Sequence, residues 1–304
     1  MVLVQLDAHF RKFIQNLTLD STRADQARAA HQSLEKFLRL DEPVRKHLYE
    51  TFIQGSYEHD TIIRPSTEDG EFDVDVVVAL DVNGMPSDRR TPEKVVAWLK
   101  SRIVANDKYL GSVRQKNRCI RITFSKMFHL DVVAAYGDTG KGVPVVVPDR
   151  DLGQWVESHP KGYTAWVNSK DRNSGNWLKR TVKMVKWWRN LKVGLDSAPK
   201  SIVLQTLIGH RIPSASSSHA HAIMNTFESL WQLLGPLAKV PIVRNPAVRT
   251  EDLARDWSQE GFERFKNHLS RAARIARQAL EHQDTSRSID LWKELFGERF
   301  PVNP

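Results

Sequence analysis

Residues 72–78 read Phe-Asp-Val-Asp-Val-Val-Val, in which two acids alternate with apolar side chains. In a β-strand, side chains two positions apart point to the same face, so Asp73 and Asp75 lie side by side while Val74 and Val76 point the other way. Two adjacent carboxylates on a buried strand repel each other unless a cation compensates them. Because oxygen ligands suit Mg²⁺ or Mn²⁺ better than zinc, the stretch predicts a divalent metal site.

A third acid, Asp131, interrupts a second apolar run at residues 128–133. If this strand pairs beside the first, the three carboxylates can hold two divalent ions. One ion then lowers the pKa of an attacking hydroxyl, and the other neutralises charge on a triphosphate and on the leaving pyrophosphate. The pattern therefore predicts phosphoryl transfer, with Asp73, Asp75 and Asp131 as catalytic residues and metal ligands.

A Gly-Ser pair lies upstream, where the apolar run 51–53 is followed by Gln54, Gly55 and Ser56. A strand that ends in Gly-Ser and turns into a helix lets backbone N–H groups approach phosphate oxygens, because glycine has no side chain and serine adds a donor. We expect Gln54, Gly55 and Ser56 to bind nucleotide phosphates. A Gly-Ser pair or an Asp-x-Asp triplet alone is common in turns and solvated strands, so the ordered combination carries the prediction.

Hydrophobic periodicity divides the chain into two parts. Helices are expected in the first part over residues 3–17, 21–40 and 92–104. Strands are expected near residues 48–54, 71–81, 109–114, 119–125 and 128–136. After residue 160 the pattern is helical, near 175–192, 200–211, 219–234, 260–282 and 288–296. The predicted fold is α+β, with a mixed sheet in residues 1–160, an α-helical lobe in residues 161–304, and residues 137–160 as the seam.

Composition limits the classes of protein that fit. The net charge of +9 favours polyanionic partners such as nucleotides, nucleic acid or an acidic protein, although a solvated basic surface explains it equally well. Charged residues interrupt the first twenty positions, and no apolar run approaches the roughly 20 residues of a membrane span. We therefore expect a soluble, cytoplasmic protein. The single cysteine, Cys119, reads as a strand residue rather than a nucleophile.

The order of these motifs resembles the polymerase-β-type nucleotidyltransferase superfamily. Within it, the chain resembles the bacterial CD-NTases, which are related to animal cyclic GMP–AMP synthase and oligoadenylate synthetase. The similarity spans nearly the whole chain and includes the stretches 147–150, 155–160, 178–189 and 291–301. The last two most resemble the D clade of that family.

The resemblance implies a polymerase-β-like core and a C-terminal helical lobe, bilobal with a central cleft. It implies synthesis of a cyclic di- or trinucleotide second messenger from ribonucleoside triphosphates, ATP among them, in antiphage signalling of the CBASS type. It also implies that Lys186 and Ser201 grip the donor triphosphate, for which a point charge and a hydroxyl are suited. Lys183, one turn earlier, is an alternative. Without the family, both lysines read as the solvated edge of an amphipathic helix.

Two positions depart from the family pattern. Residues 57–61 read Tyr-Glu-His-Asp-Thr, where relatives commonly carry an Arg-Gly-Thr-like stretch. Ile202 replaces an aromatic residue that in relatives often stacks on a base. Base specificity therefore does not follow from the sequence.

The remaining features favour packing over chemistry. We expect most tryptophans, including Trp98, Trp187, Trp231 and Trp292, to be core residues, and His219 and His221 lack companions at zinc-ligand spacing. The resemblance permits a HORMA-type regulatory protein and favours a nucleic-acid activator less. Two alternatives stay open: a transferase that adds one nucleotide to an RNA end, a protein or a small molecule, and an inactive nucleic-acid-binding or protein-binding module. The intact acid triad argues against the second.

Overall fold

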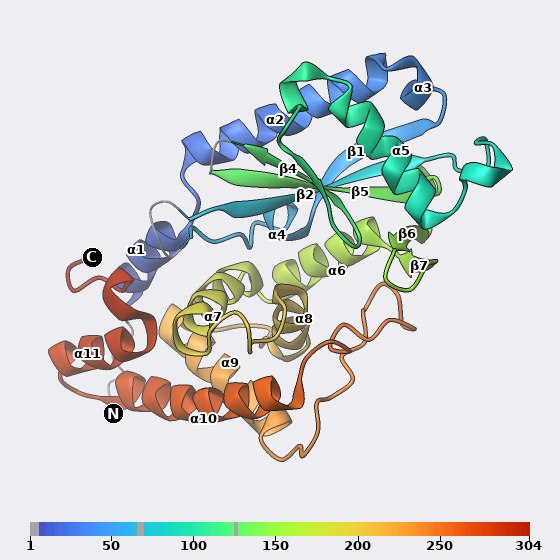
Figure 1. The fold of residues 1–304 in the computed structure, drawn as a ribbon. Helices are drawn as coiled ribbons and strands as arrows, with labels where there is room; N and C mark the ends of the chain where they lie inside the picture. Colours follow the sequence, from blue (N-terminus) through green and yellow to red (C-terminus); the bar gives the residue numbers. More distant parts are fainter. Residues whose placement is uncertain (1–5, 66–69, 125–126) are drawn as a thin grey trace. The chain divides into compact units, whose positions relative to one another are not determined.

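The computed structural model describes residues 6–65, 70–124 and 127–304, which form two units (Figure 1). The sheet unit contains residues 19–60 and 64–165, and the helical unit contains the described residues up to Thr18 together with 61–63 and 166–304. The first helix and the segment 61–63 thus belong to the helical unit. The expected domains, residues 1–160 and 161–304, stay a prediction.

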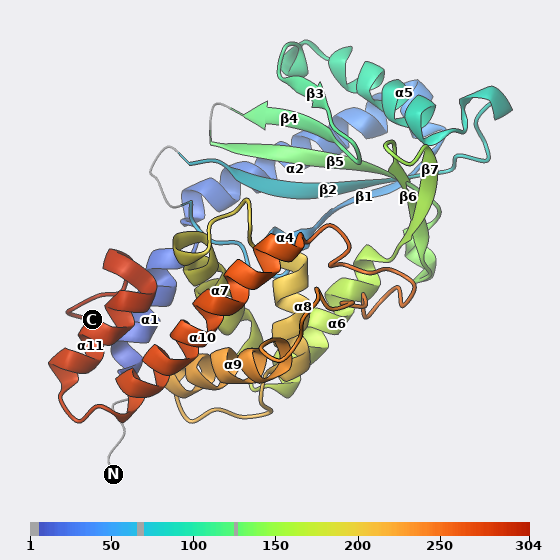
Figure 2. The same cartoon turned by 60° about the horizontal axis from the view of Figure 1, so that its bottom comes forward.

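The sheet unit is built on a seven-stranded sheet in which five strands follow the order β1-β2-β5-β4-β3, while β6 pairs with β5 and β7 with β6 (Figure 2). The strands are β1 (Leu48–Gln54), β2 (Phe72–Leu80), β3 (Val113–Gln115), β4 (Ile120–Phe124), β5 (Phe128–Tyr136), β6 (Val145–Asp149) and β7 (Gln154–Ser158). β2 and β5 are parallel neighbours, and the other pairs are antiparallel. The second half of β2 is buried throughout, which explains its unbroken Val-Val-Val-Ala-Leu run.

Two long helices, α2 (Ser21–Leu40) and α5 (Pro92–Val104), lie along one side of this sheet (Figure 1). Each begins at a residue that caps it: Asp20 accepts a hydrogen bond from the backbone N–H of Arg23, and Thr91 from that of Lys94. Two shorter helices, α3 (Glu42–Arg45) and α4 (Gly55–Glu58), flank β1. Both long helices start where the sequence predicted, so their ends are set by local capping.

Several elements differ from the sequence prediction. Residues 107–109 form a 3₁₀ turn, so the strand expected from residue 109 begins only at Val113. The seam contains β6 and β7, whose strand pattern is hidden by Pro148 and by Gly142 and Gly153 in left-handed conformation on either side. The helix α6 (Pro160–Asn173) was also missed, because its apolar residues are few and a glycine lies in its first turn.

The helical unit contains α1 (Asp7–Leu17), α7 (Leu178–Lys192), α8 (Ser201–Arg211), α9 (His219–Leu234), α10 (Gln259–Glu281) and α11 (Thr285–Phe296). Aromatic packing explains why α1 belongs here. The fully buried ring of Phe10 lies 5.0 Å from that of Trp292 and 5.1 Å from that of Phe300, measured between centroids. Trp187 is buried too, whereas Trp231 is 36% exposed and is an exception to the expected packing role.

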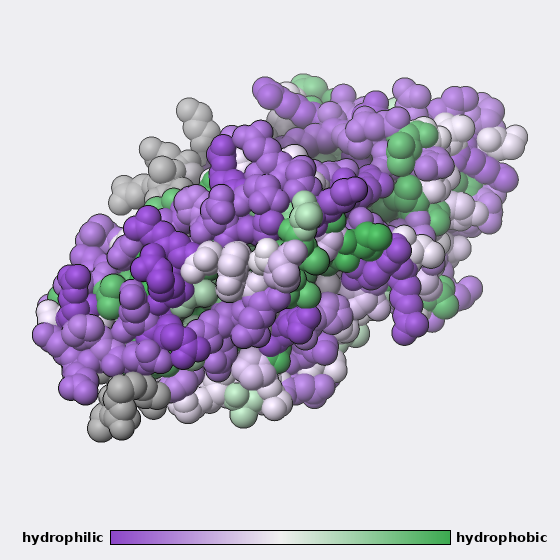
Figure 3. All heavy atoms as spheres, turned by 90° about the horizontal axis from the view of Figure 1, so that it is seen from below, coloured by the Kyte–Doolittle hydropathy of each residue, from purple (hydrophilic) through white to green (hydrophobic). Residues whose placement is uncertain are grey.

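Figure 3 shows one face of the molecule, on which hydrophilic side chains predominate and apolar ones form separate small patches. In the described part of the chain, no helix combines the length and the apolar character that crossing a membrane requires.

Candidate functional site

The parallel pairing of β2 and β5 places the three predicted acids on one face of the sheet. Asp75 is the register partner of Asp131. Two residues earlier on both strands, Asp73 is the register partner of His129. Partners in register point to the same face, and so do residues two apart on one strand. Asp73, Asp75 and Asp131 therefore share a face, which is the arrangement that a common metal site requires.

The pairing continues across five strands as a single cross-strand row. In spatial order this row consists of Gln54, Asp75, Asp131, Arg121 and Arg114. An amide, two acids and two guanidinium groups thus follow one another on the same face. Along this row the two negative charges therefore lie on the central strands β2 and β5, and the two positive charges lie on β4 and β3.

Gly55 stands immediately beyond the end of this row, where β1 ends and α4 begins. Its φ of +70° is a conformation that other residues rarely adopt. A Cβ atom at Gly55 would also collide with Asp75 Oδ2. A strand, a glycine turn and a helix follow one another here, as the sequence predicted. Because a side chain at residue 55 would collide with Asp75, only a glycine allows the backbone to pass this close to the acid. Phosphate binding by Gln54, Gly55 and Ser56 stays a prediction.

Arg121 bridges two of the acids and was missed in the sequence. Its Nε donates to Asp131 Oδ1 at 2.7 Å, and its Nη2 donates to Asp131 Oδ2 at 2.6 Å and to Asp73 Oδ1 at 2.7 Å. The hydrogen bonds that Arg121 donates to Asp131 raise the pKa of Arg121. A signal was available, because the short connection between Phe124 and Phe128 fixes the register of the hairpin. Counting back along one strand and forward along the other places Arg121 opposite Asp131.

The donor set fits a divalent ion, although the side chains do not yet surround one. Among the described residues, no group of three or more acidic, histidine or cysteine side chains is gathered closely enough to hold a metal. Asp73 and Asp131 instead share the guanidinium of Arg121. Three carboxylate side chains on one face of the sheet suit Mg²⁺ or Mn²⁺ as ligands, and the positive guanidinium of Arg121 already binds two of them. Asp73, Asp75 and Asp131 are thus the residues that would hold it.

In the helical unit, α7 carries a second set of charged residues, all of them basic. Lys183, Lys186 and Arg189 follow at intervals of three, and each is at most 5% exposed. The ammonium group of Lys186 donates to the backbone carbonyl of Thr61 at 2.8 Å. Lys183 and Lys186 are therefore not at the solvated edge of an amphipathic helix, which is the interpretation that the sequence favours when the family resemblance is set aside.

Arg189 links α7 to Ser201, the first residue of α8. Its Nη1 donates to the Pro199 carbonyl at 2.8 Å and to Ser201 Oγ at 3.3 Å, and its Nε and Nη2 both donate to Asn190 Oδ1. Among the described residues all its acceptors are neutral, and burial lowers the pKa of Arg189 to about 10. The adjacent Ile202 is 37% exposed. A buried cation without an acid thus lies beside the predicted triphosphate serine.

The other residues singled out by the sequence have structural contacts. His219 pairs with Asp7 at 2.8 Å between Nδ1 and Oδ1, and His221 Nδ1 lies 2.9 Å from Ser218 Oγ. Burial raises the pKa of the Cys119 thiol to about 12, which disfavours the thiolate that a nucleophile needs. Within 147–150, the carboxylate of Asp149 is bonded by Arg118 at 2.5 Å. That stretch therefore ties β6 to the start of β4.

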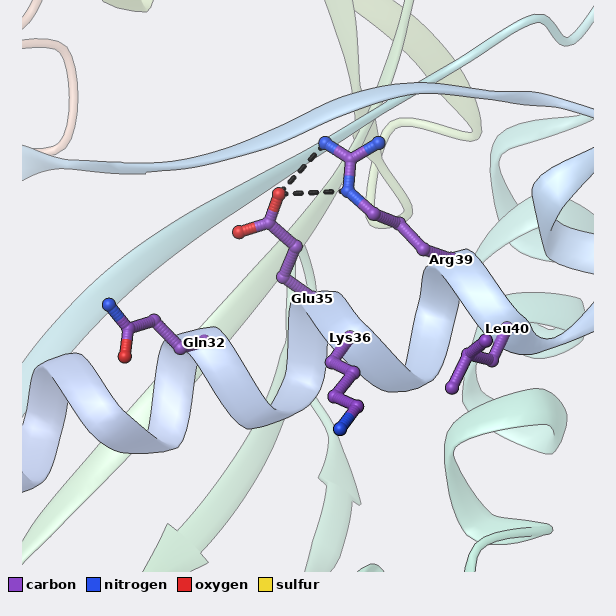
Figure 4. Close-up of a pocket in the computed structure, with 5 residues that line it drawn as sticks. All are labelled: Gln32, Glu35, Lys36, Arg39 and Leu40. Atoms are coloured by element: carbon purple, nitrogen blue, oxygen red, sulfur yellow. Dashed lines mark hydrogen bonds and ion pairs between the residues drawn. The ribbon is translucent and has the colours of Figure 1, made fainter.

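A hollow on the sheet unit lies along the exposed side of α2 and is lined by Gln32, Glu35, Lys36, Arg39 and Leu40 (Figure 4). Glu35 accepts hydrogen bonds from Arg39 Nε at 2.9 Å and Nη2 at 2.8 Å. The lining combines a helical ion pair with an amide, a lysine and an exposed leucine, and it brings no acids or nucleophiles together. The acid face of the sheet is the better candidate for chemistry.

Comparison with known proteins identifies the family of the chain. The family model described as Second Messenger Oligonucleotide or Dinucleotide Synthetase domain matches residues 4–173. The chain is 26% identical to the cyclic AMP-AMP-GMP synthase of Enterobacter hormaechei, with 98% of this chain and 93% of the relative covered. It is 24% identical to the cyclic AMP-AMP-AMP synthase of an Acinetobacter species, with 96% and 84% covered. The structure of the CdnC:HORMA-deltaN complex of E. coli MS115-1 superimposes with a TM-score of 0.77 at 16% identity, covering 98% of each chain.

Proposed function

Because the chain belongs to the family of Second Messenger Oligonucleotide or Dinucleotide Synthetase domains, we propose that Asp73, Asp75 and Asp131 hold the catalytic metal ions of a cyclic oligonucleotide synthase. The chain is a bacterial CD-NTase with the polymerase-β-like nucleotidyltransferase fold, and it makes cyclic oligonucleotide second messengers. The observation that carries the proposed site is the in-register pairing of Asp75 with Asp131, with Asp73 on the same face.

The sheet unit supplies the reacting end of the site. Divalent ions, when bound, activate the attacking hydroxyl and neutralise charge on the triphosphate. The acids that would hold them lie on two directly paired strands, so the backbone positions of the three carboxylates are set before an ion binds. Gly55 brings the turn between β1 and α4 close to the Asp75 carboxylate, and Gln54 and Ser56 flank it. We assign these three residues to the phosphates next to the metal.

The helical unit supplies cations for the rest of the triphosphate. Lys186 is oriented by its bond to the Thr61 carbonyl, and Ser201 by its bond from Arg189. A buried guanidinium whose bonds all go to neutral groups costs free energy, and an anionic ligand nearby offsets that cost. This charge distribution supports Lys186 and Ser201 as triphosphate contacts, with Arg189 as a positioning residue behind Ser201.

Substrate and partner follow from the relatives. Two of them are named for products that contain adenosine, so we propose ATP as a substrate and a cyclic di- or trinucleotide as product, made with Mg²⁺ or Mn²⁺. CdnC is solved with a HORMA protein, and we propose a regulatory partner of that type here. The expected setting is CBASS-type antiphage signalling.

The test is to incubate the purified chain with the four labelled ribonucleoside triphosphates and Mg²⁺ or Mn²⁺, with and without a HORMA partner. A product that resists phosphatase and contains no free end supports cyclisation. Label on an added RNA end, protein or small molecule supports single-nucleotide transfer instead. The double variant Asp73→Asn with Asp75→Asn should make no product, while Asp88→Asn, at an exposed position of the sheet unit, should act like the wild type. Synthesis by the double variant would refute the metal assignment.

A further inference from the structure

We propose that Arg121 is the built-in counter-ion of the metal-free site, and that a divalent ion can bridge Asp73 and Asp131 only after the Arg121–Asp73 bond breaks. The inference rests on the metal-binding role proposed above for the two acids. It concerns the loading of the ion, the step that precedes catalysis.

The positions of the atoms make the guanidinium and the ion mutually exclusive. Arg121 Nη2 lies 2.7 Å from Asp73 Oδ1 and 2.6 Å from Asp131 Oδ2. Asp73 Oδ1 and Asp131 Oδ2 are among the oxygens that would hold a divalent ion, and both already accept hydrogen bonds from this one nitrogen. The two oxygens would therefore have to give up the guanidinium before both could serve as metal ligands.

The two acids hold Arg121 unequally, which determines the bond that breaks first. Asp131 takes two hydrogen bonds from the guanidinium, and its side chain is 13% exposed. Asp73 takes one, and its side chain is 55% exposed. A single bond to an exposed carboxylate is weaker than a two-pronged bond to a largely buried one. Arg121 therefore releases Asp73 and keeps Asp131.

The other side of Arg121 gives it no competing attraction. Its register partner on β3 is Arg114, which lies on the same face and is exposed. Like charges directly opposite each other on a sheet are unfavourable, so among the described residues the attraction that holds the Arg121 guanidinium comes from Asp73 and Asp131. Arg114 also provides a matched control, because it carries the same charge on the same face about 4.8 Å farther from the acids.

The planar fork of arginine suits this task better than lysine does. Two nitrogens of one rigid group reach three oxygens of two side chains, whereas an ammonium group is a single point charge. Arg121→Lys should therefore keep the charge and lose most of the bridge. Comparing this variant with Arg121→Ala separates the effect of the hydrogen bonds that link the two acids from the effect of the positive charge.

The experiment measures Mn²⁺ binding to the full chain without nucleotide, by electron paramagnetic resonance of the free ion. We expect Arg121→Ala to bind Mn²⁺ about tenfold more tightly than the wild type, the size expected when one charge-assisted hydrogen bond no longer competes. Arg114→Ala should change the affinity by less than about threefold, because its charge is farther away and exposed. Arg121→Lys should lie between Arg121→Ala and the wild type.

A second readout is the melting temperature. In EDTA, Arg121→Ala should melt below the wild type, because its acids are left uncompensated, and Mn²⁺ should raise its melting temperature by more than that of the wild type.

Asp75→Asn and Asp131→Asn distinguish a failure of the counter-ion inference from a failure of the proposed metal site. If they abolish Mn²⁺ binding while Arg121→Ala binds no more tightly than the wild type, the metal site stands and the counter-ion inference is overturned. If both asparagine variants bind Mn²⁺ like the wild type, the acids are not its ligands, and the proposed function loses its metal site as well.

Discussion

Arg121 in the sheet unit and Arg189 in the helical unit are both bonded on several sides, but their partners are opposite in kind. Arg121 is held by two carboxylates, which raise its pKa, whereas the acceptors of Arg189 among the described residues are all neutral and burial lowers its pKa to about 10. In the part of the chain that the structure describes, Arg121 thus has acidic partners and Arg189 has none. The carboxylates around Arg121 suit a metal cation that takes the place of the guanidinium. The neutral acceptors around Arg189 suit the binding of an anion such as a triphosphate nearby.

The largest expected effect comes from the acid that holds Arg121 most firmly. Asp131→Asn should lower kcat by about a thousandfold or more, because it removes a metal ligand and with it roughly 4 kcal/mol of transition-state stabilisation. Steady-state synthesis of the cyclic product measures this.

Asp149 is the matched control, since Arg118 holds its carboxylate by two hydrogen bonds and Asp149 lies on β6, a strand outside the five-strand row of the acids. Asp149→Asn should lower the melting temperature and leave the turnover of the folded protein close to that of the wild type. Equal losses of kcat in both variants would mean that Asp131 is merely structural.

Gly55→Ala should have the next largest effect, because it pushes on Asp75. The left-handed φ of Gly55 makes alanine strained by about 1–3 kcal/mol, and the new methyl group collides with the carboxylate. Displacing a catalytic group by about 1 Å can cost roughly a hundredfold in rate.

Gly111→Ala separates strain from collision, since Gly111 also has positive φ and nothing within 4 Å of an added Cβ. We expect that variant to lose stability and keep its turnover. Denaturant unfolding and product assays on both variants measure the difference, and similar activities would remove Gly55 from the site.

Arg189→Met tests the helical unit. It should raise the KM for nucleoside triphosphate about tenfold with little change in kcat, because Ser201 loses its orienting bond and the site loses a buried positive charge. Arg189→Lys should restore part of the affinity. Arg180→Met, at an exposed position of the same helix, is the control for charge alone. A fall in kcat at unchanged KM would contradict a role in triphosphate binding.

The smallest expected effect is a pH dependence from His219, a buried base of the helical unit that does have an acidic partner. Burial lowers its pKa below 6.5, although Asp7 raises it in part. The native state then binds fewer protons than the unfolded state, so the free energy of unfolding falls as the pH drops below about 6.5. His219→Gln should flatten part of this slope between pH 7 and 5 in urea unfolding. An unchanged slope would show that His219 titrates normally.

Much of the fold followed from local rules in the sequence. Capping and periodicity placed α2 and α5, and alternation within apolar runs placed β1, β2 and β5. The division into units was harder, because α1 joins the helical unit through ring contacts with residues almost 300 positions away. No local pattern encodes such a partner.

The candidate site shows the same limit. Asp73 and Asp75 follow from strand period alone, and Asp131 needed only the assumption that its strand is a neighbour. Arg121 required the register of a hairpin, and the neutral acceptors of Arg189 required the end of α7 and the start of α8 to come together. Charges that act on one another across elements are therefore the part that sequence reasoning missed.

The most direct test of the account is a crystal structure of the full chain with Mn²⁺ and a non-hydrolysable ATP analogue, in which anomalous scattering locates the ions. The account predicts anomalous density coordinated by Asp73, Asp75 and Asp131, with Arg121 withdrawn from Asp73 and the triphosphate bound by Lys186 and Ser201. Manganese bound elsewhere, or Arg121 still bridging Asp73 and Asp131 in the nucleotide complex, would contradict it.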